Sequence, residues 1–81
     1  MRRDSVELSD TFANVVKKNR EAKNLSRAAL AQLAGLHQTY IGLLERRQRS
    51  PNLDTAKAIA NALGTPLATM VAESERMQKR P

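Results

Sequence analysis

The chain of 81 residues contains no cysteine and only one histidine, His37. Without thiols there can be no disulfide framework, no thiolate zinc site and no cysteine nucleophile. A single imidazole with no second one beside it is not a metal site, so we expect His37 to cap or pack in a turn and we predict no metal. The fold must therefore be held together by packing alone.

Residues that would build an active site are also missing. The eight carboxylates are scattered along the chain, and none stands beside a base or a nucleophile in a catalytic pattern. The three glycines are isolated, which excludes a loop that cradles phosphate. We expect no enzymatic activity and no cofactor.

Long apolar runs are absent as well. No stretch is long enough to cross a membrane, and the first ten residues have basic side chains without the apolar segment of a signal peptide. We expect a cytoplasmic protein, or one associated with a bacterial nucleoid, with no membrane partner and no evident small-molecule ligand.

Positive charge is what the chain has in excess. Fourteen Lys and Arg outnumber eight Asp and Glu, so the net charge is +6 and the isoelectric point is about 10.6. Such an excess on a small domain favours an anionic partner. The alternative is that the basic side chains only keep the protein in solution.

Apolar residues recur at helical spacing throughout, and no segment alternates as a strand does. We predict an all-α fold with five helices, at about residues 10–23, 27–34, 38–46, 53–63 and 66–73. These helices form one domain over residues 10–73, because the chain is long enough for one modest core. Residues 1–9 form an N-terminal arm, and the polar tail at 74–81 is expected to fray.

Helix ends are predicted from residues that cap them. The expected N-terminal caps are Ser9 or Asp10, Ser26, Asn52 and Thr65, the last followed by Pro66 at the first helical position. Asn24, Gly35 and Gly64 are expected where helices end, since they tolerate a left-handed backbone.

The spacing also predicts which side chains are buried. The predicted core residues are Phe12, Val15, Val16, Leu30, Leu33, Ala34, Ile41, Leu44, Leu53, Ala56, Ile59, Ala60 and Leu63. Asn19 interrupts the first apolar face, and two explanations remain open: it is hydrogen-bonded at the core edge, or it marks an interface.

The second and third predicted helices are joined by only three residues, which begin with Gly35. A short glycine-containing turn between two short helices is typical of a helix-turn-helix. With Ile41 and Leu44 buried, the opposite arc of the third helix exposes Gln38, Thr39, Gly42, Leu43 and Arg46. Gln can bond adenine through two hydrogen bonds, and Thr or Leu can contact a thymine methyl. This arc therefore predicts contact with bases in the major groove, although an ordinary polar helix face is the alternative.

Basic side chains surround this arc. Arg46, Arg47 and Arg49 follow the third helix, Arg27 opens the second, and further cations on the first helix are Lys17, Lys18, Arg20 and Lys23. Such residues, and the hydroxyl of Tyr40, can bind phosphates without reading sequence. A solvated charged face is again the alternative. We expect Glu45 to pair with a neighbouring arginine.

Several segments together resemble the phage repressor and Cro class of helix-turn-helix proteins (the XRE type), over roughly Phe12 to Val71. The matching segments are Leu25-Ser26, Leu30-Ala31, Ala34-Gly35, Thr39-Tyr40-Ile41, Leu44-Glu45-Arg46, Pro51, Leu53, Ile59-Ala60 and Ala62-Leu63-Gly64. The Thr-Tyr-Ile and Glu-Arg run is most similar to the controller proteins of restriction-modification systems.

The resemblance implies a five-helix lambda-repressor-like domain that binds a palindromic operator as a homodimer and regulates transcription. It implies base reading by Gln38, Thr39 and Leu43. It implies phosphate contacts by Arg27, Tyr40, Arg46, Arg47, Gln48 and Arg49. Two positions depart from the family pattern: Arg47 stands where glycine is common, so the loop is expected to bend differently, and Asn19 replaces an apolar residue.

The predicted partners are double-stranded DNA and a second copy of the chain. We expect dimerisation through Leu67, Met70 and Val71, which a domain this small would leave half exposed. The rival hypothesis is an antitoxin or antiactivator that acts mainly through a protein partner, because the same fold supports both roles. Only residues 74–81 are spare for a partner-binding segment, which favours DNA.

Overall fold

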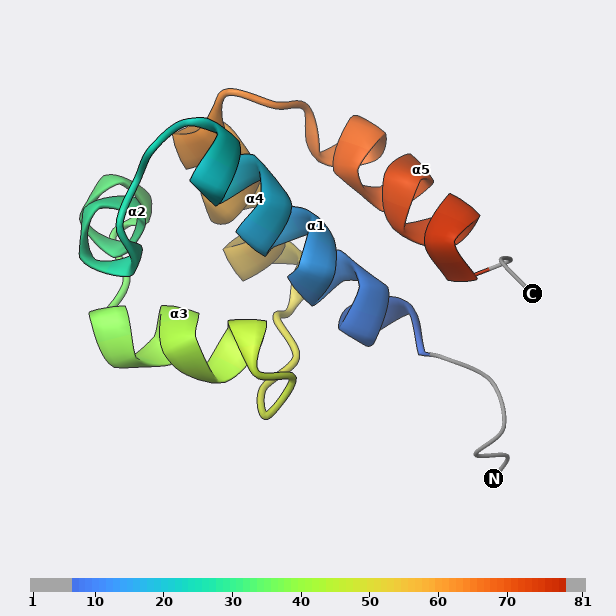
Figure 1. The fold of residues 1–81 in the computed structure, drawn as a ribbon, viewed down its shortest axis with the longest axis horizontal. Coiled ribbons are helices and arrows are strands. Elements are labelled where there is room, and N and C mark those ends of the chain that lie inside the picture. The colour runs from blue at the N-terminus through green and yellow to red at the C-terminus, as the bar shows by residue number, and fades with distance from the viewer. Residues whose placement is uncertain (1–6, 79–81) are drawn as a thin grey trace.

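The computed structural model describes residues 7–78, and these form five α-helices with no strand among them (Figure 1). The helices are α1 (Leu8–Ala22), α2 (Arg27–Ala34), α3 (Gln38–Glu45), α4 (Leu53–Leu63) and α5 (Leu67–Gln78). The all-α prediction is confirmed, and α2 and α4 have the predicted bounds. Most of the predicted arm and the last three residues of the predicted tail lie outside the described residues.

The middle helices begin and end as their capping residues predict. The Ser26 hydroxyl accepts a hydrogen bond from the Ala29 amide at 3.0 Å. The Asn52 side chain accepts one from the Thr55 amide at 2.8 Å. Each bond satisfies an amide that has no partner within the first turn of its helix. Gly35, Gly64 and Asn24 are left-handed, with φ of 74°, 71° and 58°.

The first and last helices begin differently from the prediction. Glu7 precedes the first residue of α1, so Ser9 and Asp10 lie inside the helix and do not cap it. Pro66 directly precedes α5, and its carbonyl accepts from the Met70 amide at 3.2 Å. Thr65 is therefore one residue too early to be the cap.

The core lies where α1 meets the other helices. Val15 and Val16 of α1 are fully buried with Leu30, Ile41 and Ile59 from α2, α3 and α4. Figure 1 shows α3 and α5 on opposite sides of α1. The DNA-reading helix predicted from the sequence therefore lies on the far side of α1 from α5.

Two residues of the predicted core are exposed. Leu33 is 61% exposed because Leu30 and Ala31 already fill the side of α2 that faces the core. Leu53 is 79% exposed because it opens α4, before the buried stripe that begins at Ala56.

The predicted end of α5 at residue 73 is wrong. The helix continues to Gln78, and Ser74 within it is fully buried. The Ser74 hydroxyl donates to the Met70 carbonyl at 2.7 Å, so burial does not leave this hydroxyl unsatisfied. Met77, one turn further along, packs against the core. Buried contacts therefore hold this segment in the helix despite its polar composition.

Asn19 takes the first of its two predicted roles. Its side-chain amide donates to the Val15 carbonyl at 2.8 Å, four residues earlier in the same helix. The side chain is half-buried, so Asn19 lies at the edge of the core and its amide group is hydrogen-bonded within α1.

Candidate nucleic-acid interface

The corner between α2 and α3 is built by backbone hydrogen bonds around Gly35. The Leu36 amide donates to the Ala31 carbonyl at 2.8 Å, and the Gly35 amide donates to the Gln32 carbonyl at 3.3 Å. This pattern needs a left-handed residue after the helix, which glycine adopts without a steric penalty. His37 precedes α3, is exposed and makes no side-chain cap. The short turn is therefore set by the backbone, and the prediction that His37 caps or packs is wrong.

α3 has one buried side and one exposed side, as its spacing predicts. Ile41 and Leu44 are fully buried. Gln38 and Thr39 are exposed, and Leu43 is half-buried. The helix is thus anchored by two apolar side chains, while short hydrogen-bonding groups face outward at its N-terminal end.

Gly42 departs from the predicted arc because it is buried. The guanidinium of Arg46 covers it: a Cβ built on Gly42 would lie 3.2 Å from Nη1 of Arg46. The Arg46 side chain therefore runs back along α3 toward Gln38 instead of extending away from the end of the helix.

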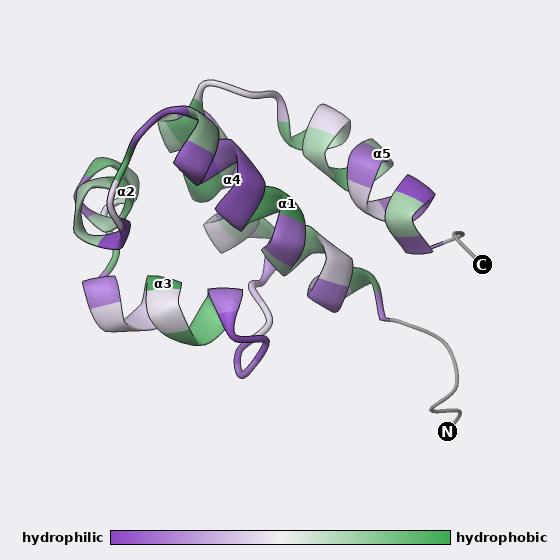
Figure 2. Cartoon of the chain, in the orientation of Figure 1, coloured by the Kyte–Doolittle hydropathy of each residue, from purple (hydrophilic) through white to green (hydrophobic). Residues whose placement is uncertain are grey.

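The loop after α3 exposes four polar side chains in a row, Arg46, Arg47, Gln48 and Arg49. Figure 2 shows this loop among the most hydrophilic parts of the chain. The Arg47 amide donates to the Leu44 carbonyl at 3.0 Å, and the Gln48 amide donates to the Leu43 carbonyl at 2.9 Å. Arg47 is left-handed with φ 64°. Arg47 thus adopts the turn conformation that glycine favours, contrary to the expected difference in the bend.

Tyr40 lies on the flank of α3 and is half-buried. Burial raises the pKa of its hydroxyl more than the nearby charge of Arg49 lowers it. The hydroxyl is therefore protonated at neutral pH and can donate a hydrogen bond to a phosphate oxygen.

Glu45 is buried and pairs with two arginines from other helices. Its side chain, 1% exposed, accepts from Nε of Arg20 at 2.7 Å and from Nε of Arg27 at 3.0 Å. Nη1 of Arg20 also donates to the Leu25 carbonyl at 2.7 Å. The ion-pair cluster of Arg20, Glu45 and Arg27 thus joins α1, α2 and α3 at the back of the exposed arc.

Arg20 and Arg27 differ in how much of the side chain is exposed and could contact DNA. Arg20 is buried, so it does not belong to the predicted phosphate-binding surface. Arg27 keeps 43% of its side chain exposed while Nε binds Glu45. Lys18 pairs with Glu73 of α5 at 2.6 Å, which ties it to the other side of α1. Lys17 and Lys23 stay exposed.

A family model of helix-turn-helix proteins (HTH_3) matches residues 16–70, which include both helices of the corner. The chain belongs to the helix-turn-helix family. The control protein C.SmaI of Serratia marcescens is 40% identical to it over 60 residues, which cover 74% of this chain and 71% of C.SmaI. The immunity repressor protein of Bacillus phage phi105 is 33% identical over 63 residues, 78% of this chain and 44% of the repressor. The chain thus spans less than half of that repressor.

A solved structure agrees with this membership. The restriction-modification controller protein C.AhdI of Aeromonas hydrophila superposes with a TM-score of 0.73 and 34% identity, over 76% of this chain and 94% of C.AhdI. The resemblance to phage repressors and controller proteins is confirmed. This helix-turn-helix protein is a DNA-binding transcriptional regulator.

Within this helix-turn-helix protein, sequence reasoning missed the ion-pair cluster. It paired Glu45 with a neighbouring arginine, whereas the partners are 25 and 18 residues away. The available signal was helical spacing, which places Glu45 on the same side as Ile41 and therefore inward. A buried carboxylate needs a cation, but spacing alone does not choose among the arginines.

Two features are absent from residues 7–78. No helix there has the length and apolar character that a bilayer span needs. In the same part of the chain, no group of three or more acidic, histidine or cysteine residues could hold a metal ion.

Proposed function

We propose that two copies of this chain bind a palindromic DNA operator and regulate transcription there, with their own gene among the targets. The observation that supports this is the two-sided α3 helix: Ile41 and Leu44 fully buried, Gln38 and Thr39 exposed. An exposed arc fixed by a buried one can enter a major groove without unfolding. Because the proposed ligand is genomic DNA, we propose that the protein acts in the cytoplasm.

The outward side chains divide into two groups by chemistry. Gln38 and Thr39 are exposed on α3 and Leu43 is half-buried there. These three side chains would contact base edges, where Gln reads adenine and Leu contacts a thymine methyl. Arg47, Gln48 and Arg49 of the loop would bind phosphates, together with Tyr40 and the exposed part of Arg27. Arg46 stands between the two groups.

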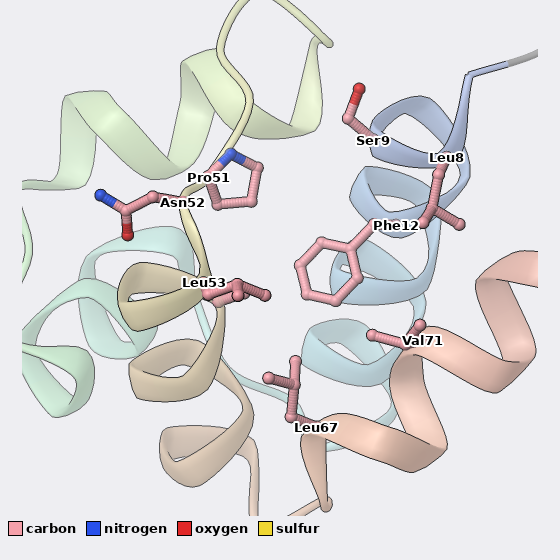
Figure 3. Close-up of a pocket in the computed structure, with 9 residues that line it drawn as sticks. Leu8, Ser9, Phe12, Pro51, Asn52, Leu53, Leu67 and Val71 are labelled. Carbon is pink, nitrogen blue, oxygen red and sulfur yellow. The ribbon is translucent and has the colours of Figure 1, made fainter.

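The proposed dimer uses α5 and the groove beside it. Leu67 and Val71 are half-buried and line an apolar groove of about 160 Å³. Figure 3 shows them facing Phe12 and Leu53 across the groove. Met70, included in the sequence prediction, has no exposed surface and belongs to the core. An isologous contact through this face would place two α3 helices in successive major grooves, about 34 Å apart.

Selection of bound fragments from random duplexes, followed by a footprint, tests DNA recognition. We expect a palindromic site with two protected half-sites. Absence of enrichment would overturn the proposal of sequence-specific binding. Sedimentation at tens of micromolar tests the dimer, and a monomer with and without DNA would contradict it.

A further inference from the structure

Arg46 directly follows the last residue of α3 and continues the exposed arc of that helix. Successive helical residues are about 100° apart, so position 46 falls between Gln38 and Leu43 and close to the direction of Thr39. Its side chain is exposed, and within residues 7–78 no carboxylate pairs with it. Arg46 is therefore free to bind a ligand, whereas Arg20 is committed to Glu45.

The guanidinium of Arg46 lies against Gly42, and we call this contact site on Gly42 the seat. Nη1, Nη2 and Cζ lie 3.2, 3.7 and 3.8 Å from where a Cβ of residue 42 would be. Side chains on a helix lean toward its N-terminus, and the missing side chain at Gly42 leaves room for the guanidinium against the helix. The charged group thus reaches one turn back, beside the side chains that would meet base edges.

Glycine at position 42 has no backbone reason to be there. The left-handed glycines of the described chain are Gly35 and Gly64, and inside a helix glycine is less stable than alanine. The contact with Arg46 gives a reason for the glycine, because a Cβ at this position would lie 3.2 Å from Nη1 and the guanidinium would have to shift by a few tenths of an ångström.

We propose that Arg46 reads a guanine in the major groove and that Gly42 positions it by providing the seat. A guanidinium has paired donors that match O6 and N7 of guanine, the commonest specific contact in protein–DNA complexes. This inference rests on the proposed DNA-binding function and changes the sequence-based assignment of Arg46 from phosphate to base. Arg47 and Arg49, beyond the end of the helix, keep their phosphate role.

The test measures Kd for a selected operator and for a set of duplexes that each have one base pair replaced. The native protein is expected to lose roughly ten-fold or more in affinity when one G·C pair is replaced. Arg46→Ala is expected to lose that preference while keeping the preferences at other positions. If Arg46→Ala weakens all duplexes by one common factor, Arg46 binds phosphate and the assignment is overturned.

The variant Gly42→Ala tests whether Gly42 positions the Arg46 guanidinium, separately from any effect of Gly42 on thermal stability. Because the Cβ meets only the mobile end of a side chain, we expect this variant to melt at the same temperature or higher. It should nevertheless lose discrimination at the same G·C pair, and it should have no further effect when combined with Arg46→Ala. Full discrimination by Gly42→Ala, or a loss at a different base pair, would refute the seat.

A charge-matched control is Arg76→Ala on α5, which is expected to change Kd by less than about two-fold because a remote surface charge is screened. A native protein that prefers no duplex would defeat the proposed function itself. A native protein that discriminates, with variants that do not alter the pattern, would defeat only the assignment of Arg46.

Discussion

Arg47 has a backbone conformation that L-residues adopt only at a cost. Its φ of 64° lies in the left-handed region, where Cβ approaches the following carbonyl oxygen. The turn needs this conformation because the amides of Arg47 and Gln48 bond the last carbonyls of α3. The strain is therefore retained in the folded state, beside a residue that we propose binds phosphate.

Two replacements of Arg47 distinguish the effect of the backbone strain from the effect of the side-chain charge. We expect Arg47→Gly to unfold with a free energy about 1 kcal/mol higher than Arg47→Ala, since only glycine relieves the left-handed strain. Both variants lose the guanidinium, so both should bind every duplex more weakly by the same factor. Chemical denaturation measures the first effect, and equal stabilities of the two variants would show that the turn is unstrained.

Glu45 makes stability depend on pH. Burial acts to raise the pKa of this carboxyl, but hydrogen bonds from Arg20 and Arg27 and their charges outweigh it, so the pKa is lowered from 4.5. A carboxyl whose pKa is lower in the folded state stabilises the fold above its unfolded pKa. That stabilisation is lost as pH falls through the folded pKa.

We therefore expect the native protein to lose free energy of unfolding below about pH 4.5 more steeply than Glu45→Gln. Near neutral pH the variant should be less stable by about 3 kcal/mol, because Arg20 stays buried with only the exposed carboxylate of Glu21, 3.9 Å away, as a counter-charge. Arg27→Ala, at a half-exposed side chain, should cost less than about 1 kcal/mol. Parallel pH profiles for the native protein and Glu45→Gln would refute the role of the ion pair.

At the scale of elements, the last turns of α5 distinguish the structure from the sequence prediction. A frayed tail would accept any polar residue at position 74, whereas Ser74 is fully buried. We expect Ser74→Glu to lower the free energy of unfolding by at least about 2 kcal/mol, because it places a charge in the core. The control Ala72→Glu, exposed in the same helix, should stay within about 0.5 kcal/mol. Equal effects of the two substitutions would mean that α5 ends earlier.

Local chemistry predicted the elements around α3. Ser26, Gly35 and Asn52 act on neighbouring backbone groups, so their roles follow from a few adjacent residues. Features that depend on distant segments were not predictable in the same way. Leu53 is exposed because no helix within residues 7–78 covers the start of α4, and the Arg27–Glu45 pair joins residues 18 positions apart. The seat on Gly42 depends on the rotamer of Arg46, which spacing does not specify.

At the scale of the whole molecule, the proposed dimer makes DNA affinity depend on half-site spacing. Inserting five base pairs between half-sites turns the second major groove to the opposite face of the duplex. We expect this to weaken binding on the order of a hundred-fold, because the two α3 helices can no longer bind together. The same insertion outside the site is the control and should leave Kd unchanged. Affinity independent of spacing would indicate that single chains bind independently.

The most direct test of α3 as the reading helix compares Gln38→Ala with Arg49→Ala on single-base-pair variants of the selected operator at two salt concentrations. Gln38→Ala should lose about 1–3 kcal/mol of preference at one base pair. Arg49→Ala should weaken all duplexes alike and reduce the slope of log K against log salt by about 0.9. If both substitutions weaken every duplex by one common factor, the exposed side of α3 does not read sequence.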